Sequence, residues 1–533
     1  MDEKVISIER AAFPEQVGVS SAAVAAFIDD LQASGIETHS LMFIRRGKVA
    51  YEAWAEPYAP EIPHTMYSVS KSVTSTAIGF AIEEGLLSLD TRVIDIFPEF
   101  EPEEPDENLE ALTVFHLLTM TAGKDVSQMA DKTKNQWIKD FFDAKWAFAP
   151  GEFWRYISEN TYMLSAMLTR VAGVSMTEYL TPRLYEPLGF GRVPFWEKDG
   201  NGIEAGGWGL FLKTEELAKY ILCYQQGGKF NGRQVVPAHW VKESGKKQVD
   251  NLQYSEPAAC CGYGYGVPMN LIPNSYRADG LFSQFGLVFN DYDACFVMTA
   301  CEMFNTKTRD CLWRHFPAIF CEESTEYPAD ETLKNRLCLP ALPNLPEAAR
   351  SEVEKTIDNK ILKIQKRRIL NELGFPVSML IMPVVQLNYE KLGNIEEIRF
   401  KFGENECEMT WRERLYKNTI VCGMDGKPRN SKIRLSQYRF TASSTAAWEN
   451  ENTLSVWMRP LESIGQRRMT FVFEGEKVTI VPSSMPDAKS MMDFVAQKVP
   501  FFVKEQVAVK AAQAVLSKAD RLLETRHKGK IKK

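Results

Sequence analysis

The chain has 533 residues, of which 45% are hydrophobic and 25% are charged, and its net charge is −7. These values are typical of a soluble globular protein with two or three domains. The negative balance gives no reason to expect nucleic acid as a partner.

Targeting and redox signals point to the cytoplasm. Residues 1–16 are acidic and lack the apolar segment of a secretory signal, and no run approaches the ~20 apolar residues of a membrane span. All ten cysteines lie at or after Cys223, without a CxxC pair, which favours reduced thiols. With no HExxH motif and no clustered His/Cys spacing, we expect neither a metal nor another cofactor.

The first predicted elements are a helix and a strand pair. Ser20 and Ser21 precede a helical pattern over residues 22–33 and are suitable caps. Residues 39–46 and 48–55 are rich in β-branched and aromatic side chains around a glycine, which predicts two strands joined by a tight turn.

Residues 64–87 predict a helix entered at Ser68, with Lys71 one turn on and Gly85 as the stop. No charge occurs between Lys71 and Glu83, and these positions are small or apolar on nearly every face. A helix that is apolar all round is buried.

Lys71 is unusual in that position. A cation in the first turn faces the positive end of the helix dipole, and a poorly solvated ammonium is costly, so both effects favour the neutral amine. Ser68 lies three residues earlier on the same face, and a hydroxyl beside such an amine suits nucleophilic catalysis. The same pattern recurs at 244–247 in a polar stretch, where it indicates no role, and a cap followed by a solvated lysine remains the alternative.

A second segment with a candidate site residue, Tyr156, follows later in the chain. A Pro-Gly turn at 150–151 leads through an aromatic, strand-like stretch to Tyr156, at the start of an amphipathic helix that ends at Gly173. Side chains at such a boundary can project into a cleft, although a tyrosine beside tryptophan and phenylalanine is usually part of a core.

These segments occur in a diagnostic order: Ser68-Val-Ser-Lys71, VFHLLTMTAG, Tyr156-Ile-Ser158, LYEPLGF and AGGWGLFLKTEELAKY. Over residues 10–325 the chain resembles the serine β-lactamase and penicillin-binding-protein superfamily, closest to the branch of class C enzymes, D-aminopeptidases and esterases. The resemblance implies an α+β domain at 1–325, with an antiparallel sheet flanked by helices and a helical subdomain.

The resemblance also implies roles for individual residues. Ser68 corresponds to the nucleophile, Lys71 and Tyr156 to the proton-transfer groups, and Ser158 to the second box, where the class C branch carries asparagine. The Ser68 N–H and an N–H on the strand after Gly280, at Leu281, would hold the oxyanion.

The third box departs further from the family. Its pattern is Lys or His, any residue, then Gly, and the best match places Ala278 where the cation is expected. Arg277 is adjacent but points to the opposite face of a strand, so we do not expect it to substitute. This box lies in a segment, 275–289, that predicts a strand paired with 294–300 across a turn at Asn290.

The remainder predicts a different architecture. Residues 326–350 are rich in Pro and Glu and predict a linker. Short alternating runs over 351–502 predict a smaller antiparallel β-domain, a sandwich or barrel. Residues 503–533 predict a helical, basic tail.

The leading functional hypothesis is a serine hydrolase that forms an acyl-enzyme on a small-molecule ester or amide. A β-lactamase or D-amino-acid peptidase is the alternative within the family. A catalytically silent protein that uses the fold for binding or scaffolding is the alternative from another class. The oligomeric state is left open.

Overall fold

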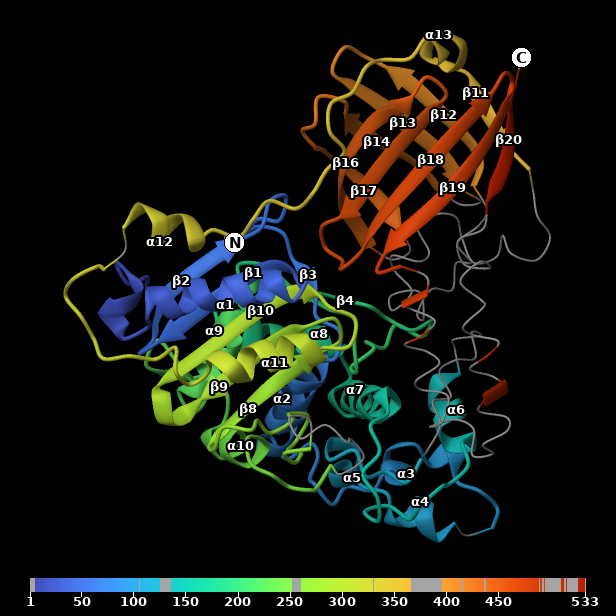
Figure 1. Ribbon diagram of the computed structural model, residues 1–533. Helices are drawn as coiled ribbons and strands as arrows, with labels where there is room; N and C mark the ends of the chain where they lie inside the picture. The colour runs from blue at the N-terminus through green and yellow to red at the C-terminus, as the bar shows by residue number, and fades with distance from the viewer. Residues whose placement is uncertain are drawn as a thin grey trace. The chain divides into compact units, whose positions relative to one another are not determined.

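Figure 1 shows the computed structural model of the chain. It describes residues 5–104, 106–124, 136–251, 260–328, 330–365, 395–413, 416–435, 438–487, 489–490, 493, 510–511, 514 and 526–532. The chain divides into two compact units, Met1–Pro340 and Ala341–Lys533. Each unit has its own buried apolar side chains.

The first unit is built around a five-stranded antiparallel sheet. Its strands lie in the order β2 (Lys48–Trp54), β1 (Glu37–Arg45), β10 (Ala294–Cys301), β9 (Gln284–Phe289) and β8 (Ser275–Gly280). The N-terminal hairpin therefore pairs directly with strands from the far end of the unit, and β8 forms one edge.

Helices cover both faces of this sheet (Figure 1). On one face lies α1 (Ser21–Ala33), whose Phe27 ring packs edge-on against aromatic rings of β1 and β10. On the other face lies α9 (Thr214–Gln225), whose Ile221 packs so closely on Gly286 that a Cβ there would lie 2.5 Å away. Because both faces are covered, most residues of these strands are buried.

The central helix α2 (Val69–Glu83) is buried continuously from Val69 to Ala81, which confirms the prediction made from its uncharged sequence. It packs against α7 (Ser158–Ala172). The remaining helices of the first unit are α3 (Val93–Ile96), α4 (Glu107–Ala111), α5 (Val114–Leu118), α6 (Trp137–Asp143), α8 (Met176–Leu180), α10 (Ala238–Ser244), α11 (Thr306–His315) and α12 (Glu331–Arg336).

Two small sheets complete this unit. The three-stranded sheet has the order β3 (His64–Thr65), β5 (Leu210–Leu212) and β4 (Phe195–Trp196). The two-stranded sheet pairs β6 (Lys229–Phe230) with β7 (Arg233–Gln234). Strand β3 ends three residues before Ser68, which immediately precedes α2.

One predicted strand is a hairpin in the structure. The segment 275–289 is divided into β8 and β9 by a tight turn at 281–283, where Phe282 and Ser283 both have positive φ. Alternation runs across such a turn without interruption, so it did not reveal the reversal. The expected turn at Asn290 is present and joins β9 to β10.

The second unit is a β-barrel. Its ten-stranded sheet has the order β14 (Tyr416–Gly423), β13 (Glu406–Glu413), β12 (Ile395–Phe402), β11 (Ile361–Ile364), β20 (His527–Ile531), β19 (Lys477–Met485), β18 (Gln466–Glu474), β17 (Thr453–Pro460), β16 (Tyr438–Asn450) and β15 (Arg429–Leu435). A further pairing of β14 with β16 closes the sheet, and α13 (Val353–Ile357) precedes it. This agrees with the predicted smaller antiparallel β-domain.

The ends of the predicted segments differ in detail. The boundary between the units falls after Pro340, inside the predicted linker, which also contains α12. The prediction of a helical tail is wrong for His527–Ile531, because these residues form β20, which pairs with both β11 and β19. Lysines alternate with buried residues in this strand. This alternation is the pattern of a strand with one buried face, although the lysines alone suggested a solvated basic end. Most of 503–525 lies outside the described residues.

Candidate active site

Ser68 lies at the junction of β3 and α2, immediately before the first helical residue. Its Oγ makes no capping hydrogen bond to the helix and instead lies 2.9 Å from Lys71 Nζ. The preceding residue, Tyr67, has a φ of 45°, a left-handed conformation that costs free energy for a bulky side chain. Such strain persists only where surrounding packing holds it, and here it sits next to the candidate nucleophile.

Lys71 is almost fully buried, with 1% of the residue exposed. Besides Ser68, its Nζ lies 2.7 Å from the Gly207 carbonyl oxygen and 3.1 Å from Ser158 Oγ. Burial lowers the pKa of Lys71 to about 7, while the charge of Glu159 acts weakly in the opposite direction. The neutral amine is therefore well populated near neutral pH.

These three contacts can satisfy either form of the amine, since an ammonium can donate to all three oxygens and a neutral amine can donate to two of them. A neutral amine has two N–H bonds and one lone pair, and a carbonyl oxygen can only accept. In the neutral form, one N–H donated to Gly207 and the other to Ser158 leave the lone pair of Lys71 to accept from the Ser68 hydroxyl. In this arrangement the lysine can accept the hydroxyl proton as a general base.

Tyr156 lies beside this group, two residues before the start of α7. The centre of its ring is 4.8 Å from Lys71 Nζ. The ring also packs with an aromatic cluster that includes Trp154 and Tyr263. Packing of this kind restricts the ring and keeps it next to the lysine.

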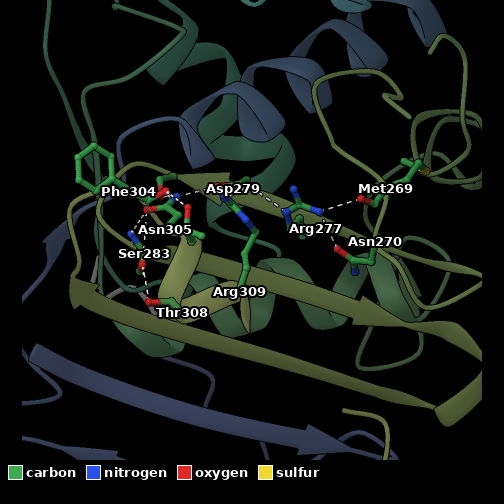
Figure 2. Close-up of polar contacts among 11 residues, drawn as sticks. Met269, Asn270, Arg277, Asp279, Ser283, Phe304, Asn305, Thr308 and Arg309 are labelled. Carbon is green, nitrogen blue, oxygen red and sulfur yellow. Dashed lines mark hydrogen bonds and ion pairs between the residues drawn. The ribbon is translucent and has the colours of Figure 1, made fainter. Parts of the chain in front are cut away.

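The third box occupies the edge strand β8. Ala278 is buried and pairs in register with Gly286, on the face covered by α9. Arg277 points to the other face, as predicted, where its guanidinium donates to Asp279 Oδ2 at 2.8 Å and to the Met269 carbonyl oxygen at 2.7 Å (Figure 2). It is therefore held in an internal network and does not replace the missing cation.

Gly280 is the last residue of β8 and is required by a close approach. A Cβ at this position would lie 2.5 Å from the Met66 carbonyl oxygen, far inside van der Waals contact. This brings the peptide between Gly280 and Leu281 against the backbone that leads to Ser68. Leu281 lies in the turn after β8 and not on the strand where it was expected, because the strand ends at Gly280.

The two candidate oxyanion segments also touch through side chains. The ring of Tyr67 packs against the ring of Phe282 with a centroid distance of 5.1 Å and an interplanar angle of 62°. Tyr67 precedes the N–H of Ser68, and Phe282 follows that of Leu281. This edge-on contact holds the two backbone donors near one another.

Sequence reasoning missed the Gly207 carbonyl as an anchor for Lys71. The signal was the glycine pair at 206–207, quoted only as part of a family segment. A Cβ on Gly207 would lie 2.7 Å from the Ser158 carbonyl oxygen, so only glycine lets this loop approach α7. The structure thus brings together four predicted residues, Ser68, Lys71, Tyr156 and Ser158, and adds a fifth group from a distant loop.

Three absences among the described residues concern metal sites, membrane-spanning helices and disulfide bonds. Among the described residues, no three or more His, Cys, Asp and Glu side chains gather in a way that could hold a metal ion. Within the same residues, no helix is both long and apolar enough to cross a membrane. None of the ten cysteines, all of which are described, forms a disulfide bond.

Comparison with known proteins gives the site its context. The sequence pattern of the beta-lactamase family matches residues 24–314, more than half of the chain. The chain belongs to the beta-lactamase family. Every site residue named above lies within the matched region, including Ser68, Lys71 and Gly280.

Curated proteins that are similar to this chain in sequence have diverse names. A 6-aminohexanoate-dimer hydrolase from Paenarthrobacter ureafaciens is 25% identical over 253 residues, which cover 43% of this chain and 63% of the relative. The esterase EstB from Burkholderia gladioli is 25% identical over 173 residues, covering 29% of this chain and 44% of the relative. The chain thus spans less than two thirds of the length of these curated relatives.

A solved structure supports the fold. A putative 6-aminohexanoate-dimer hydrolase from Bacillus anthracis superimposes with a TM-score of 0.50 at 16% identity, covering 60% of this chain and 88% of that chain. Together with the family match, this establishes a beta-lactamase-like fold.

Proposed function

We propose that this chain is a serine hydrolase that cleaves an ester or small amide through an acyl-enzyme. Ser68 is the nucleophile, and Lys71 and Tyr156 are the proton-transfer groups. The observation that carries the proposal is the environment of Lys71, which is buried, has a pKa lowered to about 7, and lies 2.9 Å from Ser68 Oγ.

In the acylation step, Ser68 Oγ attacks the substrate carbonyl carbon while Lys71 accepts the hydroxyl proton. Charge develops on the carbonyl oxygen, and the N–H groups of Ser68 and Leu281 stabilise it. Loss of one such donor typically lowers the rate by a factor of about 10²–10³.

Proton transfer to the leaving group completes acylation. The proton passes from Lys71 to the departing oxygen or nitrogen, with Tyr156 sharing it. Water then attacks the acyl-enzyme with the same groups acting in reverse, and Ser68 is regenerated. Ser158 supports both steps because its Oγ accepts one N–H of the neutral lysine.

The third box favours an uncharged substrate over one with a carboxylate. The cation that normally binds a substrate carboxylate in this family is replaced by Ala278, and Arg277 is already held by Asp279. The names of two relatives, an esterase and a 6-aminohexanoate-dimer hydrolase, agree with an ester or small amide. A β-lactamase or D-amino-acid peptidase is the second candidate, since another relative at 27% identity, from Escherichia coli, is named a beta-lactamase.

The decisive experiment is intact-protein mass spectrometry after incubation with a fluorophosphonate probe. A single adduct on the parent that is absent from Ser68→Ala supports an activated serine. Hydrolysis of aryl esters and anilides without hydrolysis of β-lactams would then distinguish the first candidate from the second. No adduct on well-folded parent protein would overturn the proposal in favour of a catalytically silent binding protein.

A further inference from the structure

The peptide between Gly280 and Leu281 is held from one side by a single side chain. Asn305 Nδ2 donates a hydrogen bond of 2.8 Å to the Gly280 carbonyl oxygen. In a planar trans peptide the carbonyl and the following N–H point in opposite directions. The contact therefore turns the Leu281 N–H away from Asn305 and fixes the plane in which it points.

The same amide also holds the far end of the turn. Asn305 Oδ1 accepts from the Ser283 N–H at 2.7 Å, and Nδ2 makes a second contact of 3.1 Å with Asp279 Oδ1. Both ends of the three-residue turn that contains Leu281 are thus attached to one side chain.

Asn305 directs its side chain to the turn and not to the helix that follows it. It is the cap residue of α11, yet its side chain forms no hydrogen bond to that helix. Asparagine at a cap position normally stabilises the helix in this way. Asn305 is 5% exposed and has a φ of 60°, which is not the extended conformation usual for a cap, and its buried amide bonds to the turn.

The turn does not have a relaxed conformation of its own. Phe282 and Ser283 are consecutive non-glycine residues with φ of 62° and 70°, a conformation that such residues rarely adopt. Gln284 Nε2 supports it from the opposite strand by donating to the carbonyl oxygens of Phe282 at 2.9 Å and Ala300 at 2.8 Å. External clamps of this kind can maintain a strained backbone.

The clamp is itself anchored. Asp279 Oδ2 accepts from Arg277, and Arg277 also donates to the Met269 carbonyl oxygen and to Asn270 Oδ1 at 3.1 Å. The network therefore runs from the protein interior along β8 to Asn305 and the turn (Figure 2).

We propose that Asn305 is a positioning residue that aims the Leu281 N–H at the oxyanion formed on Ser68. This inference rests on the proposed hydrolase function. Asn305 does not touch the reacting atoms; it acts through the Gly280–Leu281 peptide, which lies against the Met66 backbone on its other side. The network then serves to pre-organise one backbone donor before substrate binds.

The informative variant is Asn305→Asp. It conserves side-chain size, tolerates positive φ, and keeps an oxygen that can accept from the Ser283 N–H. An ionised carboxylate cannot donate to the Gly280 carbonyl oxygen, so the clamp on the peptide is lost. The contact with Asp279 Oδ1 also becomes a contact between like charges. Asn305→Gly, which also accepts positive φ, removes the same donations without adding a charge beside Asp279 and is measured alongside the first variant.

Thr308→Ala is the matched control. It removes the hydrogen bond of 2.8 Å between Ser283 Oγ and Thr308 Oγ1 within the same cluster, and it leaves the Gly280–Leu281 peptide untouched. It should disturb the turn through one lost hydrogen bond without the catalytic effect.

The readouts are steady-state kinetics and the infrared carbonyl stretch of an acyl-enzyme made with a ¹³C=O-labelled ester. For Asn305→Asp we expect kcat to fall about 10- to 100-fold, somewhat less than full loss of a donor, with KM within about twofold of the parent. We expect the acyl carbonyl stretch to move to higher frequency, because its hydrogen bonds weaken. Thr308→Ala should keep the parent frequency.

The outcomes separate two failures. A parent that forms no acyl-enzyme overturns the proposed function, and with it this inference. A parent that acylates, with an unchanged carbonyl frequency in both folded Asn305 variants, overturns the positioning role alone. A shift of equal size in Thr308→Ala would also overturn it, since general disturbance of the turn would then be sufficient.

Discussion

Lys71 and Ser68 lie one helical turn apart at the start of a buried helix, with Nζ 2.9 Å from Oγ. The lysine cannot gain water as a partner because it is 1% exposed. Its contacts with Gly207 and Ser158 leave the direction toward Ser68 for its lone pair. The predictions below follow from this site and from the elements that build it.

Lys71→Met should abolish acylation while the fold is retained. The general base is lost, and we expect the rate of probe adduct formation to fall by about 10²–10⁴-fold. Stability should stay level or rise, because an apolar side chain of similar length replaces a buried amine. Probe labelling and thermal unfolding measure the two effects. Lys219→Met, at another buried lysine, is the control and should still acylate; equal labelling of both variants would contradict the assigned role.

The pH dependence should reveal the amine of Lys71. Its pKa is about 7 in the folded chain and about 10.4 in an unfolded one. kcat/KM should therefore rise with pH and level off above an inflection near 7. Between these two values the unfolded state binds more protons, so the stability contributed by this residue should increase as pH rises from about 7 to about 10. A rate profile that inflects only near 10 would contradict the lowered pKa.

Ser158→Ala should slow the reaction without preventing folding. The substitution leaves one N–H of buried Lys71 without its acceptor, and an unsatisfied buried donor costs about 1–3 kcal/mol. We expect kcat/KM to fall about 10- to 100-fold, as measured with an aryl ester. Ser165→Ala, a buried serine on the same helix, should stay within about twofold of the parent. If the two variants behaved alike, Ser158 would be a packing residue only.

Gly280→Ala should damage activity more than its effect on stability explains. The new Cβ would meet the Met66 carbonyl oxygen at 2.5 Å and push the end of β8 away from Ser68. Overpacking of this kind costs about 1–3 kcal/mol, and we expect kcat to fall at least tenfold. Gly245→Ala is the control, because its Cβ would overlap the Tyr276 ring at 2.6 Å, away from the serine. Gly245→Ala should lose stability while kcat is largely kept. Unfolding curves and steady-state kinetics of both variants test this difference.

Ile531→Asp should destabilise the second unit through β20. Ile531 is 9% exposed and pairs in register with Leu362 of β11, so the variant buries an unpaired carboxylate, a change in the most destabilising class. Lys530→Asp is the neighbouring control. Lys530 is exposed and pairs with Lys363 and Lys477, so the reversed charge should be neutral or slightly favourable. Urea unfolding tests both, and equal stability would place this segment outside the barrel.

The sequence predicted the elements whose signals are local. The buried helix was identifiable because a run without charge needs no knowledge of its neighbours. The short alternating runs of the second unit likewise indicated antiparallel strands. The hairpin at 281–283 was missed because its residues with positive φ are Phe282 and Ser283, and no glycine lies within the turn to signal it. The last strand was missed because alternating lysines resemble a solvated end.

For the site, the sequence by itself determined the chemical groups and their order along the chain: a serine and lysine one turn apart, a tyrosine before a second helix, and a glycine at the end of a strand. Only the tertiary structure decided how these groups are oriented. Gly207 holds Lys71 from 136 residues away, and Asn305 holds Gly280 from 25 residues away. Contacts of this kind depend on packing between elements, because a backbone carbonyl carries no signal in the sequence until the fold brings it to its partner.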